Sequence, residues 1–283
     1  MKSRNRQAKH LGVSRRIVRV EPRRQRRVNR EPGPRYLCNE WRRIVGRLRA
    51  APRIVLFLDF DGTLAPLQVH PEGVWLDDDT RHLLDRLARR INVFVISGRR
   101  RADLSRRVRV SAVECLGLYG WEGRTKGLKP FGDRRLIDGT RRLAETRLGR
   151  LPGIRIENKG PLFTVHFRGA PPDAIRQAKA AVRKIVAPRR PDLRLLTNKS
   201  AWEILPRDFK GKGAVVESLL SESPPDTLAV YFGDDGPDEE AFQVLRDGLT
   251  VVVGRRSLTA ARYYVRNSAE VKRMLTRLEA AIT

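Results

Sequence analysis

The segment LFLDFDGTL at residues 56 to 64 decides the expected fold. The apolar run that contains it, Ile54 to Leu58, has no polar alternation, which predicts a central parallel strand covered on both faces. Asp59 and Asp61 follow, and Gly62 allows a sharp turn directly after them. Because alternate residues of an extended chain point the same way, we expect the two carboxylates to lie side by side at the end of this strand.

A second acidic segment, YFGDDGPDEEAF at residues 231 to 242, has the same organisation. Its apolar run, Leu228 to Phe232, ends just before Asp234 and Asp235, and Asp238 opens a predicted helix. Both acidic segments would therefore lie at the carboxyl ends of buried strands, where open α/β sheets form their sites.

Clustered carboxylates repel one another and would be partly neutral without a cation between them. Mg²⁺, a hard ion that prefers oxygen ligands and accompanies phosphate, satisfies this requirement. Taken alone, a DxD segment is equally compatible with a solvated turn, and Glu239 and Glu240 are ordinary acidic residues of a first helical turn. The two segments together predict a magnesium-dependent phosphoryl-transfer enzyme.

Four segments occur in a characteristic order: DFDGTL, VISGR at residues 95 to 99, GKG at 211 to 213, and GDDGPDEEAF at 233 to 242. This order resembles the motif set of the haloacid dehalogenase superfamily of aspartate-nucleophile phosphatases. The resemblance implies an α/β fold with a Rossmannoid core, in which helices cover both faces of a parallel sheet.

The resemblance also implies roles for four residues. Asp59 would attack phosphorus and form an aspartyl-phosphate, and Asp61 would serve as general acid and base. Ser97 would donate a hydrogen bond to the phosphoryl group, and Lys212 would offset negative charge. Without the ordered set, Ser97 would be ordinary turn chemistry and Lys212 a solvated surface charge.

The implied metal site uses the same strand ends. Asp59, the backbone carbonyl of Asp61, and Asp234 would hold Mg²⁺, while Asp235 and Asp238 would orient those ligands or their waters.

The chain between the second and third motifs has its own pattern of elements and is too long for a loop. Residues 128 to 205 are expected to form an inserted α/β cap that closes over the site. The elements expected in it are helices over 136–148 and 171–186 and strands over 154–157, 163–167, 193–196 and 202–205.

Two segments of this insert resemble the trehalose-6-phosphate phosphatases: IENKGPLFTVHFR at residues 156 to 168 and NKSAWEILP at 198 to 206. By this resemblance the residues that bind the phosphorylated disaccharide are Glu157, Lys159, Lys199 and Glu203, joined by Arg99 of the second motif. Charged, fork-like partners suit a ligand with many hydroxyl groups. The alternative for Glu157 and Lys159 is that they are exposed strand residues that pair only with each other.

The activity implied is Mg²⁺-dependent hydrolysis of trehalose 6-phosphate to trehalose and phosphate through an aspartyl-phosphate. Sucrose phosphate or mannosyl-phosphoglycerate are alternative substrates for the same fold. A different class of protein, a basic nucleic-acid-associated protein with an inactive phosphatase-like scaffold, is disfavoured because a scaffold does not need the complete acidic set. A trehalose-phosphate synthase is a possible partner.

The sequence departs from the family pattern in three places. The family usually has a Gly, any residue, His, Gly segment before the cap, whereas this chain has LYGWEGR at residues 118 to 124, with Trp121 and Glu122 in that region. Pro237 stands where Thr is usual, and Asn198 where Gly is common. None of these changes removes a proposed catalytic carboxylate.

Composition favours a cytoplasmic enzyme. With 283 residues, 40% of them hydrophobic, the chain can bury a sizeable core. No apolar run approaches the length of a membrane span, and the N-terminal segment lacks the apolar core of a secretory signal. Cys38 and Cys115 are far apart and show no metal-ligand spacing, which is typical of a reducing compartment.

The net charge of +27 is concentrated near the N-terminus, where residues 1 to 50 contain seventeen Lys and Arg against three Glu. Residues 1–35 are expected to form a basic, disordered tail. Polyanion binding, a general bias toward Arg and a start codon annotated too far upstream all account for such a tail, and nucleic-acid binding is disfavoured because no recognisable motif accompanies it. The catalytic core is expected over 36–127 and 206–283, and its first element is an amphipathic helix from Tyr36 to Ala50 that docks on the core.

Overall fold

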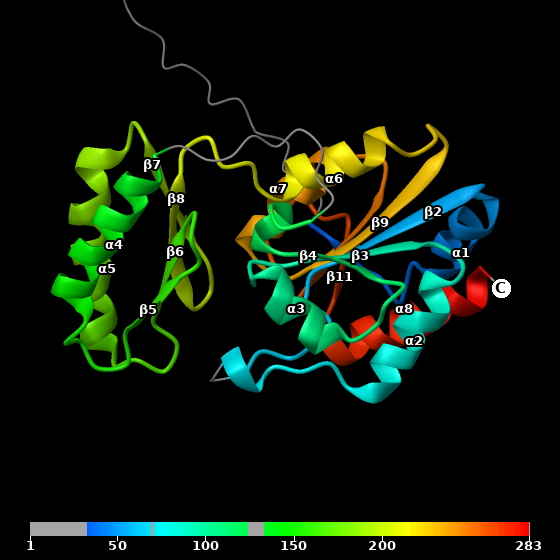
Figure 1. The fold of residues 1–283 in the computed structure, drawn as a ribbon. Coiled ribbons are helices and arrows are strands. Elements are labelled where there is room, and N and C mark those ends of the chain that lie inside the picture. Colours follow the sequence, from blue (N-terminus) through cyan, green and yellow to red (C-terminus); the bar gives the residue numbers. More distant parts are fainter. Residues whose placement is uncertain (1–32, 69–70, 124–132, 283) are drawn as a thin grey trace, which may run out of the picture. The chain divides into compact units, whose positions relative to one another are not determined.

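A seven-stranded parallel sheet and a four-stranded antiparallel sheet organise the residues that the computed structural model describes, 33–68, 71–123 and 133–282 (Figure 1). The strand order of the larger sheet is β1-β11-β10-β9-β2-β3-β4. Its strands are β1 (Arg35–Tyr36), β2 (Arg53–Leu58), β3 (Asn92–Ile96), β4 (Glu114–Leu116), β9 (Thr227–Gly233), β10 (Leu249–Val253) and β11 (Tyr263–Val265).

Helices cover both faces of the parallel sheet, as the sequence predicts. Figure 1 shows α6 and α7 on one side and α2 and α8 on the other. The helices of this part of the chain are α1 (Trp41–Ala50), α2 (Asp78–Ala88), α3 (Arg101–Val108), α6 (Lys212–Ser221), α7 (Gly236–Val244) and α8 (Ser268–Ala281).

Strand β2 shows why its sequence lacks polar alternation. Leu56 and Leu58 pack in a cluster with residues of α1, α2, α3 and α8, whereas Val55 and Phe57 pack on the opposite face with residues of α6 and α7. Since successive side chains of a strand point to opposite faces, a strand buried on both sides must be apolar throughout.

The N-terminal part of the core differs from the predicted helix over Tyr36 to Ala50. Helix α1 begins only at Trp41, and Arg35–Tyr36 forms the edge strand β1, paired in parallel with β11. Helix α1 does dock on the core, where Ile44 and Leu48 are buried. Of the expected tail over residues 1–35, residues 1–32 lie outside the described residues. Arg35, at its end, belongs to strand β1 of the sheet.

The smaller sheet lies between the second and third motifs in sequence, where the cap is expected, and has the order β5-β6-β8-β7. Its elements are β5 (Arg155–Asn158), β6 (Phe163–His166), β7 (Leu193–Thr197), β8 (Ala201–Pro206), α4 (Arg134–Leu148) and α5 (Pro172–Val186). Both helices pack on the same face of this sheet around Phe163, Val165 and Trp202 (Figure 1). These elements agree with the predicted α/β insert, but its first boundary, at residues 127 and 128, lies outside the described residues.

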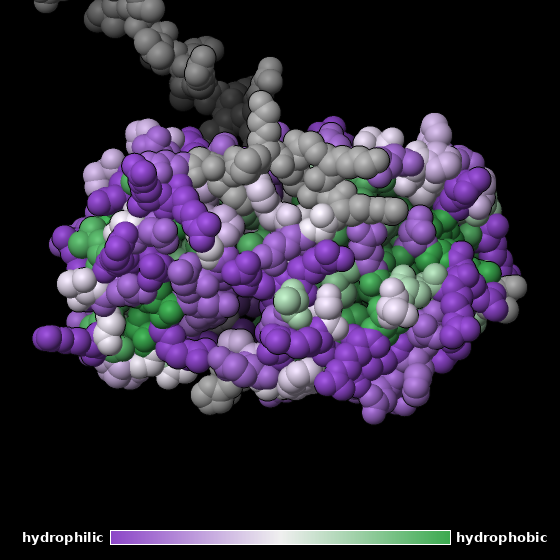
Figure 2. All heavy atoms as spheres, viewed as in Figure 1, coloured by the Kyte–Doolittle hydropathy of each residue, from purple (hydrophilic) through white to green (hydrophobic). Residues whose placement is uncertain are grey.

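The surface is rich in charge. Hydrophilic residues cover most of the face seen in Figure 2, in keeping with a chain in which 32% of residues are charged. Among the described residues, no helix has both the length and the apolar character needed to cross a bilayer.

Helix α2 begins with an N-cap that also ties it to α8. The carboxylate of Asp77 accepts hydrogen bonds from the backbone N–H and the hydroxyl of Thr80 and from the Lys272 ammonium of α8, at 2.7 to 3.0 Å. Partial burial raises the pKa of Asp77, but the bonds from Lys272 and Thr80 outweigh this effect and hold the pKa at about 2. Since the folded pKa lies below the unfolded value, the charge of Asp77 stabilises the fold.

We therefore expect Asp77→Ala to lower the free energy of unfolding by about 1 kcal/mol at pH 7, the usual cost of losing an N-cap. The electrostatic part of this difference is fully present above about pH 4 and is lost as the pH falls toward the folded pKa of about 2. Urea denaturation at pH 7 and pH 3 measures both effects. Asp78→Ala, at the exposed neighbouring carboxylate, is the matched control, and equal losses in the two variants would contradict the assignment.

Candidate active site

Three neighbouring strands of the parallel sheet end in polar side chains. Asp59 follows β2, Ser97 follows β3 and Asp234 follows β9. Since β2 pairs in parallel with both β3 and β9, the three carboxyl ends meet at one edge of the sheet. All three side chains are buried there. Asp59 and Asp234, which the sequence places at strand ends, therefore lie at the same edge of the sheet.

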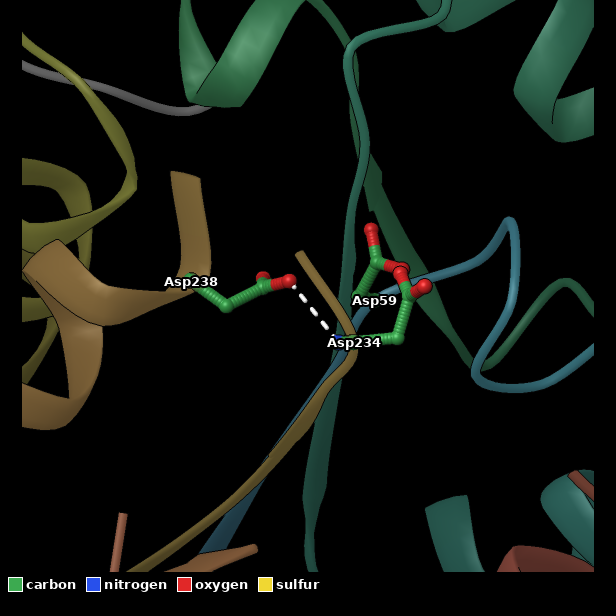
Figure 3. Close-up of side chains that lie close together, drawn as sticks. All are labelled: Asp59, Asp234 and Asp238. Carbon is green, nitrogen blue, oxygen red and sulfur yellow. Dashed lines mark hydrogen bonds between the residues drawn. The ribbon is translucent and has the colours of Figure 1, made fainter. Parts of the chain in front are cut away.

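An acidic cluster forms at this edge. Carboxylate oxygens of Asp59, Asp234 and Asp238 lie within 4.8 Å of one another. Figure 3 shows the carboxylates of Asp59 and Asp234 side by side, with Asp238 reaching toward them from α7. Burial raises the pKa of Asp59 well above its usual value, and the charges of Asp238 and Asp234 act in the same direction, against Lys212.

Lys212 provides the buried positive charge of this cluster. It is the first residue of α6, and its ammonium donates to Oδ1 of Asp59 and to Oδ1 of Asp238, both at 2.6 Å. Burial lowers the pKa of Lys212, but the two carboxylates outweigh this effect and raise the pKa above its usual value. Lys212 therefore stays charged and holds the carboxylate of Asp59 in place.

Asp238 has its oxygens committed to the protein. Oδ2 accepts the backbone N–H groups of Asp234 and Asp235, and Oδ1 accepts the hydroxyl of Tyr231 in addition to Lys212. Asp235 completes a capping box at the start of α7, in which Asp238 is the reciprocal residue. Asp238 thus fixes the strand end that carries Asp234.

The residues present fit a divalent cation. Asp59 and Asp234 offer carboxylate oxygens, the donors that Mg²⁺ prefers. Gly62, at φ 91°, lies so close that a Cβ atom there would come within 2.5 Å of Oδ2 of Asp234, so the glycine leaves the space that the carboxylate fills. Burial raises the pKa of Asp234 to about 6, opposed by the nearby charge of Lys199. A cation between these carboxylates would relieve their mutual repulsion.

Asp61 and Arg99 form a fork-like pair at the mouth of the cluster. Two guanidinium nitrogens of Arg99 donate to the two carboxylate oxygens of Asp61 at 2.7 Å each, and the same guanidinium reaches Asp103 and the carbonyl of Pro71. Arg99 lines the pocket, and its donors are directed to protein acceptors.

The cap presents a polar row in register across its sheet. Glu157 pairs with Thr164, and Thr164 with Glu203, across β5, β6 and β8. Their sequence neighbours, such as Phe163 and Trp202, point the other way into the core formed with α4 and α5. The strand period of two therefore directs one row of polar side chains into the pocket.

Lys159 joins the cap to the core. Its buried ammonium donates to the carbonyl of Gly98 at 3.0 Å and to Oε1 of Glu203 at 3.1 Å, and lies 3.8 Å from Glu157. Burial lowers the pKa of Lys159, but the carboxylates of Glu203 and Glu157 outweigh this effect and raise the pKa. The alternative in which Glu157 and Lys159 pair only with each other is therefore wrong.

Two further charged residues of the cap, Glu157 and Lys199, line the pocket. Burial raises the pKa of Glu157, but the hydrogen bond from His166 and the charge of Lys159 lower it to about 2. The ammonium of Lys199 contacts Oδ2 of Asp234, and its backbone N–H donates to Asp235 at 2.9 Å.

All these side chains line one pocket of about 1160 Å³. The predicted residues found in its wall are Asp59, Asp61, Ser97, Arg99, Glu157, Lys159, Lys199, Glu203, Lys212, Asp234, Asp235 and Asp238. The structure thus brings together every residue that the sequence singled out for the site.

The departures from the family pattern have structural explanations. Pro237 lies in the first turn of α7, where the missing N–H costs nothing. Trp121 stacks on Phe209, and Glu122 pairs with Arg100 and accepts the backbone N–H of Arg101 at the start of α3.

Sequence reasoning missed Tyr119, which is buried in the pocket wall. Its hydroxyl donates to Glu203 and accepts from Asn198. The available signal was spacing, because Gly117 to Gly120 reproduces the Gly, any residue, His, Gly pattern with Tyr119 in the place of His.

Comparison with known proteins identifies what this site resembles. The family model described as trehalose-phosphatase matches residues 57–269. A trehalose-phosphate phosphatase of Mycobacterium tuberculosis is 32% identical over 243 residues, which cover 79% of this chain and 60% of that protein. A probable trehalose-phosphate phosphatase J of Arabidopsis thaliana is 28% identical over 263 residues, covering 85% of this chain and 70% of that protein. This chain thus spans about 60% of the length of its mycobacterial relative.

Among solved structures, the C-terminal domain of a C. albicans trehalose-6-phosphate phosphatase superposes with a TM-score of 0.78. The match covers 88% of this chain and 98% of that one at 22% identity, and it shows the shared fold.

The contact between Lys199 and Asp234 generates a prediction about metal affinity. The ammonium of Lys199 competes with a cation for the same carboxylate. Lys199→Met should therefore tighten binding of Mn²⁺ to the substrate-free protein about fivefold, because a half-exposed ion pair contributes about 1 kcal/mol, which corresponds to that factor in affinity. Electron paramagnetic resonance of free Mn²⁺ measures the affinity. Lys179→Met, at an exposed lysine of α5, is the control, and unchanged or weaker binding by the Lys199 variant would refute the competition.

Proposed function

Because this chain belongs to the trehalose-phosphatase family, we propose that it hydrolyses trehalose 6-phosphate to trehalose and phosphate in the presence of Mg²⁺. The observation that carries this proposal is a single pocket with two chemically distinct walls. One wall holds Asp59 beside Lys212 at the edge of the parallel sheet, and the other holds Glu157 and Glu203 on the cap sheet. The first suits phosphoryl transfer and the second suits a ligand with many hydroxyl groups.

Asp59 acts as the nucleophile in this proposal. Its carboxylate attacks phosphorus, a bond forms between Asp59 and phosphorus, and the bond from phosphorus to the sugar oxygen breaks. Lys212, at 2.6 Å from Oδ1, fixes the carboxylate and balances the charge of the phosphoryl oxygens. Ser97, buried at the end of β3, donates to one of those oxygens.

Asp61 moves the protons. It donates a proton to the departing sugar oxygen, and in the second half-reaction it takes a proton from the water that attacks the aspartyl-phosphate, which frees Asp59. In the structure the fork-like pair with Arg99 holds Asp61 as a carboxylate in one orientation, so one of its oxygens must leave the guanidinium and take up a proton before Asp61 can act as the acid. Arg99 lines the same pocket and would contact the substrate there.

Asp59, the backbone carbonyl of Asp61, and Asp234 would hold Mg²⁺, with Asp235 and Asp238 supporting them. When bound, the ion neutralises the negative charge that gathers on the transferring phosphoryl group. The raised pKa values of Asp59 and Asp234 fit this assignment, because both carboxylates are buried close to other acids.

Substrate selection falls to the cap. Glu157, Lys159, Lys199 and Glu203 would contact the sugar hydroxyls. Glu157 already contacts His166, Lys159 the carbonyl of Gly98, and Lys199 the carboxylate of Asp234. A substrate would therefore have to replace or share these contacts.

We retain three further proposals from the sequence: a cap over residues 128–205 inserted in a core over 36–127 and 206–283, a cytoplasmic location, and a trehalose-phosphate synthase as partner.

The first test of the proposed function is a substrate panel. With Mg²⁺, the purified protein should release phosphate from trehalose 6-phosphate with a kcat/KM at least about tenfold above that for glucose 6-phosphate or sucrose 6-phosphate, because a site built for hydroxyl groups rejects ligands that leave its polar groups unpaired. Chelation of the ion should abolish the release. Equal low rates on all three compounds would reject trehalose 6-phosphate as substrate, and a clear preference for sucrose 6-phosphate would establish the alternative.

The second test concerns the covalent mechanism. Asp59→Asn removes the nucleophile without changing its size, and turnover should fall by about 10³-fold or more. Thermal unfolding checks that the variant is folded, and Asp79→Asn, at an exposed carboxylate of α2, serves as control. Turnover retained by the Asp59 variant would rule out an aspartyl-phosphate.

A further inference from the structure

Tyr119 occupies a backbone conformation that needs an explanation. Leu118 and Tyr119 have φ values of 48° and 60°, in the left-handed region that residues other than glycine rarely adopt. Two backbone hydrogen bonds hold them there, from Leu118 N–H to the carbonyl of Arg99 at 2.7 Å and from Tyr119 N–H to the carbonyl of Ser97 at 2.8 Å. Such strain costs about 1 to 3 kcal/mol for each residue and collects at functional sites.

The strained turn places the phenol of Tyr119 between the catalytic edge and the cap. A Cβ atom built on Gly98 would lie 2.8 Å from the Tyr119 hydroxyl, so the ring packs directly over the turn of the second motif. The ring also meets Phe209 edge-on, with centroids 6.0 Å apart. The hydroxyl therefore has a fixed position above Ser97 and Gly98.

From this position the hydroxyl reaches the carboxylate of Glu203. Oε2 of Glu203 accepts from Tyr119, while Oε1 accepts from Lys159 and from the hydroxyl of Thr164, both at 3.1 Å. Burial, and then the charge of Glu203, raise the pKa of Tyr119 well above its usual value, so the phenol keeps its proton and donates it. Glu203 is thus held by one donor from the core and two from the cap.

Asn198 completes the arrangement. Its side-chain N–H donates to the Tyr119 hydroxyl at 3.3 Å, and its Oδ1 atom is buried without a hydrogen-bond partner among the described residues. Asn198 and Tyr119 lie on different parts of the chain, and both stand where the family pattern has another residue. The two departures therefore meet in one hydrogen bond beside Glu203.

We propose that the Tyr119 hydroxyl, steadied by Asn198, is a positioning donor that orients the Glu203 carboxylate toward the hydroxyl groups of the sugar, so that these two residues set the preference of the pocket for a hydroxyl-rich substrate. This inference rests on the proposed phosphatase activity and extends it to residues that the motifs do not contain. With Oε1 occupied by Lys159 and Thr164, the free lone pair of Oε2 and Oδ1 of Asn198 are the acceptors that the network leaves for a sugar hydroxyl.

Tyr119→Phe tests the proposal, because it removes the hydroxyl and keeps the ring that packs against Phe209. We expect the KM for trehalose 6-phosphate to rise about tenfold, with kcat changed less than threefold. A tenfold rise is the effect expected from the loss of one hydrogen bond to a charged group. The ratio of kcat/KM for trehalose 6-phosphate to that for p-nitrophenyl phosphate, which has no hydroxyl groups, should fall by a similar factor. Tyr36→Phe is the matched control, since it removes a tyrosine donor to the carboxylate of Glu270 at the far edge of the sheet, and its ratio should equal that of the wild type.

Asn198→Ala provides a second variant in case the first does not fold. Its ratio should fall in the same direction, and in the double variant the two effects should not add, because both act through Glu203. A ratio within twofold of wild type for Tyr119→Phe, or an equal loss with both substrates, would overturn the proposal. If the wild type prefers a different sugar phosphate, the proposed substrate fails, and the same ratio measured with that compound still decides the role of Tyr119.

Discussion

The buried ammonium of Lys212 is the interaction on which the site depends. Asp59, Asp234 and Asp238 place three carboxylates within 4.8 Å at the edge of one sheet, and each would cost several kcal/mol if it were charged and uncompensated. Lys212 joins Asp59, from β2, to Asp238, from α7, although 153 residues separate it from the first. The parallel order of β9, β2 and β3 is what brings these distant segments to the same edge.

Core and cap share a small apolar cluster, in which Tyr119 packs with Leu162 and Leu205, and several polar contacts made by residues of the pocket. Lys199 of the cap contacts Asp234, Lys159 of the cap donates to the carbonyl of Gly98, and Tyr119 of the core donates to Glu203 of the cap. Apolar contacts would be indifferent to a bound ligand, whereas each of these groups can exchange its present partner for a phosphoryl oxygen or a sugar hydroxyl. The polar contacts that join the cap to the core therefore lie in the wall of the pocket itself.

The sequence predicted the elements whose signal is local. The continuous apolar run of β2 identifies a strand buried on both faces, and the acidic residues after it need no distant partner to be recognised. The edge strand β1 could not be found in this way, because two residues carry no period and its pairing with β11 depends on a segment more than 200 residues away. The spacing of Gly117 to Gly120 marks the position of Tyr119 in the sequence, but its left-handed backbone, held by the carbonyl groups of Ser97 and Arg99, could not be predicted from the sequence.

The positive charge of the chain also has a structural use in the described part. Several arginines donate their guanidinium to backbone carbonyls at the ends of elements: Arg47 to Asp247, Arg107 to Glu72, Arg189 to Ile185, Arg194 to Phe209, Arg207 to Arg190 and Arg262 to Arg246. A guanidinium can satisfy carbonyls that a helix end or turn leaves open, and it stays charged at any physiological pH. These six arginines thus have a structural role in the fold. Polyanion binding is not needed to account for arginine in residues 33–282, and the basic character of residues 1–32 is consistent with the same preference for arginine throughout the chain.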